Sequence, residues 1–130
     1  MQESQDITVV LVDDHAIVRE GIAALCSASG MSILGQCSDG AAAVEMIAAL
    51  QPDFAILDLN MPAPDGFEFL KTVRARFPYM RILVISGYLD GALLEAATLL
   101  GAIATLAKPV EAKTLLAKVR EVIGTPRRDS

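Results

Sequence analysis

The chain has 130 residues, of which 53% are hydrophobic and 21% are charged, and its formal net charge is −5. This length suits one compact domain, and the apolar content excludes an intrinsically disordered chain. The acidic balance argues against direct binding of nucleic acid, which usually requires a basic face.

Five short apolar runs along the chain predict β-strands. The first, third and fourth runs are continuous rather than alternating, which is typical of strands buried on both faces of a parallel sheet. In chain order the runs are Ile7–Val12, Ser32–Cys37, Phe54–Leu57, Ile82–Ile85 and Ile103–Leu106.

The segments between these runs carry apolar residues at helical spacing, so a helix is expected after each strand. Punctuating residues agree, because carboxylates or hydroxyls stand where N-caps belong and glycines stand where helices end. The expected caps are Ser38 or Asp39, Asp65 and Asp90, and the expected terminal glycines are Gly30, Gly101 and Gly124. Five strand–helix units predict an α/β fold with one five-stranded, doubly wound parallel sheet.

The expected domain covers residues 7–124, with a disordered N-terminus at 1–6 and a C-terminal tail at 125–130. The first residues are polar and form no signal peptide, and no apolar run reaches the roughly 18 residues of a membrane span. Cys26 and Cys37 form no CxxC motif, and His15 is the only histidine, so a zinc site is not expected. The cysteines are interpreted as reduced core thiols of a cytoplasmic protein.

Polar residues follow four of the five predicted strands. Asp13 and Asp14 follow the first strand, Asp58 the third, Ser86 the fourth and Lys108 the fifth. In doubly wound sheets ligands bind at the carboxyl ends of the strands, so these groups are expected to converge. Three converging carboxylates require either a shared proton or a cation, and hard oxygen ligands suit Mg²⁺.

Together these groups suit a phosphoryl group, since they supply a nucleophilic carboxylate, a metal, a cation and a hydroxyl. Singly, each has an ordinary structural interpretation: an aspartate can cap a helix, Ser86 can lie in a turn, and Lys108 can be a solvated surface residue. Their joint placement on one edge of the sheet favours a functional site.

Four segments resemble the receiver domains of two-component response regulators. They are LVDDH (Leu11–His15), LDLNMPAPDG (Leu57–Gly66), VISG (Val84–Gly87) and AKP (Ala107–Pro109). The resemblance extends over about Ile7 to Ile123. It implies a flavodoxin-like (βα)5 fold with strand order 2-1-3-4-5. The stretch VDDHAIVREGIAAL is similar to receivers of the NarL type, which precede a helix-turn-helix output domain.

The resemblance also implies a role for each site residue. Asp58 would accept a phosphoryl group from a sensor histidine kinase or a phosphotransfer protein, Lys108 would bind a phosphoryl oxygen, and the Ser86 hydroxyl would move toward the phosphoryl group. Such a domain is not an enzyme in the ordinary sense, because it catalyses only its own phosphorylation and dephosphorylation. The implied Mg²⁺ ligands are Asp13, Asp14, Asp58 and the backbone carbonyl of Asn60.

One position departs from the family pattern. Many receivers carry Phe or Tyr three residues before the lysine, and this chain has Thr105 there. Activation without an aromatic rotamer change is therefore one hypothesis, and a degenerate receiver that serves as a scaffold is another. A simple preference of threonine for a strand also explains the residue.

Two other classes of protein fit the sequence less well. An Mg²⁺-dependent phosphatase that forms an aspartyl phosphate would carry a DxD motif after the first strand, whereas Asp13 and Asp14 are adjacent. A flavodoxin-like cofactor-binding module would carry a phosphate-binding loop rich in Ser, Thr and Gly at the same place.

The fourth predicted helix carries more leucines than one buried face can hold. Some apolar surface is expected to be exposed there or covered by a partner, which allows a homodimer. A DNA-binding output domain in a longer parent chain is the other implied partner, and binding to a membrane is not expected. The leucines are Leu93, Leu94, Leu99 and Leu100.

Overall fold

The computed structural model describes residues 7–13, 15–58, 65–86, 91–99, 101–107 and 110–123. Within these ranges the side chains of residues 65–67, 86, 91–94, 107 and 123 are not described. The predicted disordered N-terminus at 1–6 and the tail at 125–130 lie outside the described residues. None of the helices in the described ranges is long and apolar enough to cross a membrane.

Strands and helices alternate along the described chain, as the sequence predicts. The sheet is parallel, and its strand order is β2-β1-β3-β4-β5. The strands are β1 (Ile7–Val12), β2 (Met31–Cys37), β3 (Phe54–Asp58), β4 (Arg81–Ser86) and β5 (Ala104–Ala107). The helices are α1 (Ala16–Ala28), α2 (Gly40–Leu50), α3 (Asp65–Arg76), α4 (Gly91–Leu99) and α5 (Ala112–Ile123).

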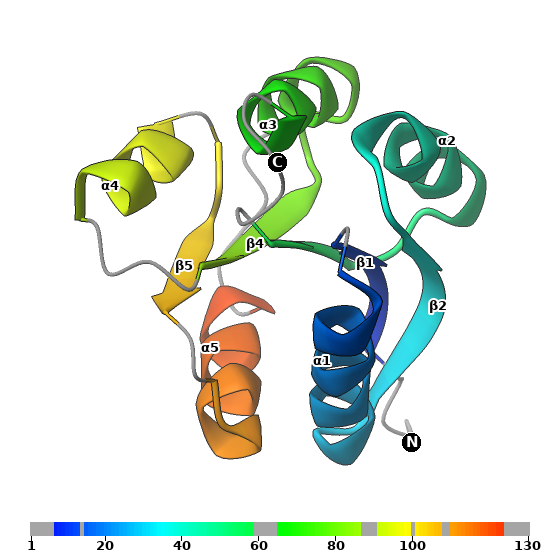
Figure 1. Cartoon of the computed structure of the whole chain (residues 1–130), viewed down its shortest axis with the longest axis vertical. Coiled ribbons are helices and arrows are strands. Elements are labelled where there is room, and N and C mark those ends of the chain that lie inside the picture. Colours follow the sequence, from blue (N-terminus) through cyan, green and yellow to red (C-terminus); the bar gives the residue numbers. More distant parts are fainter. Residues whose placement is uncertain are drawn as a thin grey trace.

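The helices cover both faces of the sheet. Helices α1 and α5 lie on one face, and α2, α3 and α4 lie on the other (Figure 1). Each face has its own apolar core, because alternate residues of a strand point to opposite sides. Val9, Leu11 and Ile56 pack toward α1 and α5, whereas Val10 and Leu57 pack toward the other three helices. This doubly covered arrangement explains the continuous apolar runs.

The described helix ends agree with most of the predicted caps, but α3 begins at Asp65 itself, so Asp65 is the first residue of that helix rather than its N-cap. The side chain of Asp39 caps α2 by accepting a hydrogen bond of 2.8 Å from the Ala42 N–H. Gly30 and Gly101 follow α1 and α4 with φ of +84° and +117°, in the left-handed region where a Cβ is disfavoured. The C-cap of α2 is instead Gln51, whose φ of +50° the sequence did not indicate. Asp90 and Gly124 lie outside the described residues.

A hydrogen-bonded pair aligns the central strands at the edge of the sheet opposite the predicted site. The Thr8 N–H and hydroxyl both donate to Asp53 Oδ2, at 2.9 and 3.1 Å, and the Asp53 N–H donates back to Thr8 Oγ1 at 2.9 Å. Asp53 directly precedes β3, so the pair fixes the register in which Val12 lies opposite Leu57. The carboxyl ends of β1 and β3 therefore lie side by side at the same edge of the sheet.

Candidate functional site

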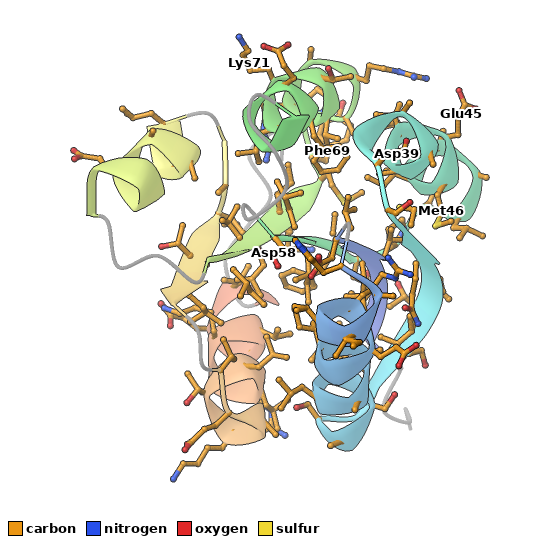
Figure 2. All side chains as sticks on the ribbon, viewed as in Figure 1. Asp39, Glu45, Met46, Asp58, Phe69 and Lys71 are labelled. Atoms are coloured by element: carbon orange, nitrogen blue, oxygen red, sulfur yellow. The ribbon has the colours of Figure 1, made fainter. Side chains whose placement is uncertain are left out.

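Asp13 and Asp58 meet at the carboxyl ends of the two central strands. Asp58 is the last residue of β3, and Asp13 directly follows β1. Because Val12 and Leu57 are paired, the two aspartates that follow them lie next to each other. Asp13 is only 2% exposed and Asp58 only 1%. Both line one small hollow, and Figure 2 shows Asp58 near the middle of the sheet, between the helices of the two faces.

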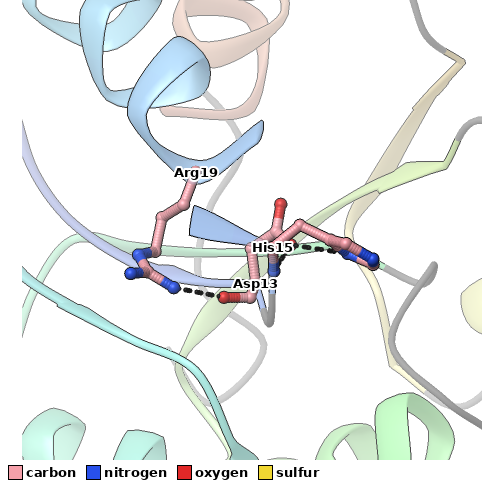
Figure 3. Close-up of polar contacts among 3 residues, drawn as sticks. All are labelled: Asp13, His15 and Arg19. Atoms are coloured by element: carbon pink, nitrogen blue, oxygen red, sulfur yellow. Dashed lines mark hydrogen bonds and ion pairs between the residues drawn. The ribbon is translucent and has the colours of Figure 1, made fainter. Parts of the chain in front are cut away.

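Hydrogen bonds hold Asp13 on three sides. Its N–H donates to the Cys37 carbonyl at 3.1 Å, which extends the β1–β2 ladder by one residue. Its Oδ1 accepts a bond of 2.9 Å from the His15 N–H. Its own carbonyl accepts a bond of 2.6 Å from the Arg19 guanidinium (Figure 3). The backbone and the carboxylate of Asp13 are therefore both oriented by the protein.

His15 acts in this loop mainly through its backbone. It is the N-cap residue of α1, and its side chain makes no capping hydrogen bond. Its ring Nδ1 lies 3.7 Å from Asp13 Oδ1, but the side chain is 58% exposed, so solvent weakens any attraction between them. In the structure His15 therefore contributes to the loop before α1 chiefly through its main chain.

The other predicted site residues are only partly described. The main chain of Ser86 ends β4, at the same edge of the sheet as Asp58, but its side chain is not described. The remaining predicted residues, namely Asp14, Asn60 and Lys108, lie outside the described residues. Across the described part of the chain, no group of three or more His, Cys, Asp or Glu side chains forms a cluster that could hold a metal.

The described residues nevertheless fit the predicted cation. Two carboxylates, both buried, stand together at the end of the sheet, and like charges so placed repel each other. Hard oxygen atoms of this kind are the ligands that Mg²⁺ prefers. Two of the four predicted ligands are thus side by side.

Arg19 is a residue of this region that the sequence predictions missed. It lies in the first turn of α1, is half-buried and lines the same hollow as the two aspartates. Its Nε donates to Gln36 Oε1 on β2 at 3.3 Å. The sequence does show an arginine shortly after the acidic pair, in VDDHAIVREG. Its contact could not be predicted, because the partner is a backbone carbonyl and no residue type indicates it.

The two cysteines are free and buried, as predicted. Burial raises the pKa of the Cys26 thiol to about 11. Burial also raises the pKa of Cys37 to about 11; the Asp39 carboxylate adds to this rise and the Arg19 charge partly opposes it. Both thiols are therefore protonated at neutral pH and are poor nucleophiles or metal ligands.

Thr105 lies within β5, opposite Val84 of β4. Val84 belongs to the core on the α2, α3 and α4 side, so Thr105 points to that side as well. The side chain is half-buried. The strand position of Thr105 is thus as expected, and its consequence for signalling stays a prediction.

Comparisons with known proteins agree with this geometry. The sequence profile of the response regulator receiver domain matches residues 9–120. The probable transcriptional regulatory protein NarL of Mycobacterium tuberculosis (strain CDC 1551 / Oshkosh) is 37% identical over 128 residues, which cover 93% of this chain and 59% of that protein. The DNA-binding transcriptional activator DevR/DosR of M. tuberculosis (strain ATCC 25618 / H37Rv) is 31% identical over 89% of this chain and 54% of its own length.

The fold is also shared with solved structures. The signal receiver domain of the putative response regulator NarL from M. tuberculosis superposes with a TM-score of 0.84 at 34% identity, over 94% of this chain and 100% of that domain. The chain spans just over half the length of the curated relatives. Nothing in these comparisons favours the phosphatase alternative. The profile match, the relatives and the shared fold show that this chain belongs to the response regulator receiver domain family.

Proposed function

We propose that this receiver domain is a phosphorylation switch in which Asp58 accepts the phosphoryl group. The observation that carries the proposal is the burial of Asp58 beside Asp13, at the carboxyl ends of adjacent strands. Two neighbouring buried carboxylates normally destabilise a folded protein, because both charges lose their contact with solvent and repel each other. A chain that retains it is expected to use it.

The roles of the residues around Asp58 follow from the family resemblance. Asp13 and Asp14, together with Asp58 and the carbonyl of Asn60, would hold Mg²⁺, and Lys108 would pair with a phosphoryl oxygen. When bound, Mg²⁺ would neutralise the carboxylates and the incoming phosphoryl oxygens. The hydroxyl of Ser86 would donate a hydrogen bond to the phosphoryl group and so bias the conformation of the segments next to it.

The proposed phosphodonor is a sensor histidine kinase or a phosphotransfer protein. The proposed location of the reaction is the cytoplasm. The proposed chemistry is limited to phosphorylation and dephosphorylation of Asp58 itself, so the domain would not turn over external substrates. Since the relatives are transcriptional regulators of greater length, we propose that a DNA-binding output domain belongs to the same pathway, either in a longer parent chain or in a partner.

A homodimer is the second proposed partnership. Leu99, at the end of α4, is 82% exposed, which supports the expectation that this helix presents apolar surface. Sedimentation of the protein with and without beryllofluoride tests the proposal. A monomer in both states, together with no change in the Leu99→Lys variant, would exclude the dimer.

Acetyl phosphate, a small phosphodonor, tests the function of Asp58. The wild-type chain incubated with acetyl phosphate and Mg²⁺ should gain the mass of one phosphoryl group, and Asp58→Asn should gain none. Asp39→Asn is a matched control, because asparagine can still cap α2. Equal labelling of wild type and Asp58→Asn would refute the assignment, and sustained turnover of a generic phosphate ester would favour the phosphatase alternative.

A further inference from the structure

We infer that Arg19 is a positioning residue, which holds the connection between β1 and α1 in place and thereby raises the affinity of the site for a divalent cation. This inference rests on the proposed function, since it concerns the same cation. It adds a residue that contacts neither the cation nor the phosphoryl group in the proposed site. Arg19 would act through the backbone of Asp13.

The contacts of Arg19 connect three parts of the fold. The residue belongs to α1, and its guanidinium donates to the Asp13 carbonyl at 2.6 Å (Figure 3). Its Nε donates to Gln36 Oε1 on β2 at 3.3 Å. Arginine suits this bridge because its planar fork can donate in two directions at once. Bonds from a charged donor are also stronger than those from a neutral one.

The carbonyl that Arg19 holds belongs to the peptide bond between Asp13 and Asp14. Its orientation therefore fixes the main chain that carries both predicted carboxylate ligands. The Asp13 N–H bond to the Cys37 carbonyl fixes the side of Asp13 toward β1, and the His15 N–H bond to Oδ1 restrains the loop beyond Asp14. Without Arg19, the carbonyl between Asp13 and Asp14 would lose its charged donor, so the peptide plane that leads to Asp14 would be less firmly oriented.

The positive charge of Arg19 should by itself lower the affinity for a cation, which is opposite to the effect of positioning the main chain. The residue lines the hollow shared by Asp13 and Asp58, so its positive charge repels a metal ion there. If repulsion dominated, removal of Arg19 would tighten metal binding. Positioning should dominate, because the charge is directed at the carbonyl and is partly exposed to solvent, whereas residues that orient metal ligands commonly alter affinity by about 10–100-fold.

Binding of Mn²⁺ alone, measured from the electron paramagnetic resonance signal of the free ion, tests the inference on the folded protein. Arg19→Met should weaken binding about tenfold. Arg19→Lys, which keeps the charge but loses the fork, should also weaken it several-fold. Gln36→Ala, which leaves Arg19 on the carbonyl alone, should have a smaller effect of about twofold. Arg120→Met removes an exposed charge from α5 and should bind as wild type does.

A urea titration of each variant separates positioning from a general structural role. Lower stability with unchanged Mn²⁺ affinity would overturn the inference, as would wild-type or tighter affinity in Arg19→Met. If Arg19→Met fails to fold, wild-type affinity in both Arg19→Lys and Gln36→Ala would overturn it instead. Failure of the proposed function is distinguishable, because then the wild type itself would not bind Mn²⁺, or Asp13→Asn and Asp58→Asn would bind as tightly as the wild type.

Discussion

Asp13 and Asp58 lie side by side at the ends of neighbouring parallel strands, with 2% and 1% of their surfaces exposed. The apolar residues before them, Val12 and Leu57, are paired and packed in the core, which fixes the main chain at the two aspartates. Like charges placed so close repel each other, which opposes folding. A cation bound between them would recover that free energy.

Magnesium is therefore expected to stabilise the fold. At 10–100 times its dissociation constant, a ligand that binds only the folded state raises the free energy of unfolding by about 1–3 kcal/mol. Thermal unfolding followed by circular dichroism should show this rise with Mg²⁺ and its loss with EDTA. Asp58→Asn should lose most of the rise, whereas the control Asp39→Asn should keep it. Equal shifts in wild type and Asp58→Asn would mean that the cation binds elsewhere.

Arg74 is expected to be a major contributor to stability. It extends from α3 and donates to the carbonyls of Pro78, Met80 and Gly101, at 2.7, 2.9 and 2.6 Å, so it joins the loops before β4 and β5. Because hydrogen bonds from a charged group contribute about 1.5–3 kcal/mol each and are not additive, Arg74→Met should lower the free energy of unfolding by about 3 kcal/mol. Urea unfolding measures the loss.

Arg76, on the same helix, provides the matched control for this prediction. Its exposed side chain lies over the Phe77 ring at 5.3 Å from the ring centroid, and exposed contacts of this kind contribute about 0.5–1 kcal/mol. Arg76→Met should therefore cost less than Arg74→Met. Similar losses of stability in the two variants would show that the carbonyl contacts of Arg74 stabilise the fold no more than the exposed contact of Arg76 does.

The buried thiols predict a fall in stability at alkaline pH. The pKa of Cys26 and Cys37 is about 11 in the folded chain and near the ordinary value of 9.0 in the unfolded chain. Between these values the unfolded chain has released thiol protons that the folded chain still holds, so stability falls as the pH rises from 9 to 11. Below this window the two thiols contribute no pH dependence.

A comparison with the Cys26→Ala, Cys37→Ala double variant isolates this effect. Urea unfolding at several pH values should show a steeper alkaline loss of stability in the wild type than in the variant. A thiol reagent at pH 8 should also react slowly with the native wild type and quickly in urea. Identical pH dependence in both proteins, or rapid labelling of the native chain, would contradict the prediction.

Much of the fold could be predicted from local patterns in the sequence. The five apolar runs predicted the strands to within about one residue, and the signal was clearest for β1, β3 and β4, because a strand buried on both faces must be apolar throughout. The clearest difference is β5, which begins at Ala104 rather than at Ile103. The side chain of Ile103 is 36% exposed, although its N–H still donates to the Ile82 carbonyl of β4.

The convergence of Asp13 and Asp58 was also predictable, because it follows from the position of each residue at a strand end in a parallel sheet. The arginine contacts that support the site and the loops could not be predicted. Arg19 and Arg74 donate to backbone carbonyls, which every residue has, so no complementary residue type marks the partner. The left-handed Gln51 was missed for a similar reason, since only glycine and asparagine signal that conformation clearly.

Reduction of the phosphorylated protein with borohydride, followed by mapping of the product by mass spectrometry, tests the central claim most directly. An aspartyl phosphate is converted to homoserine by this treatment, so the modified position is marked in the peptide sequence. We predict that, after acetyl phosphate and Mg²⁺, homoserine is found at position 58 and not at Asp39, Asp53 or Asp65. Homoserine at another aspartate, or no homoserine in a chain that remains folded, would contradict the assignment of Asp58.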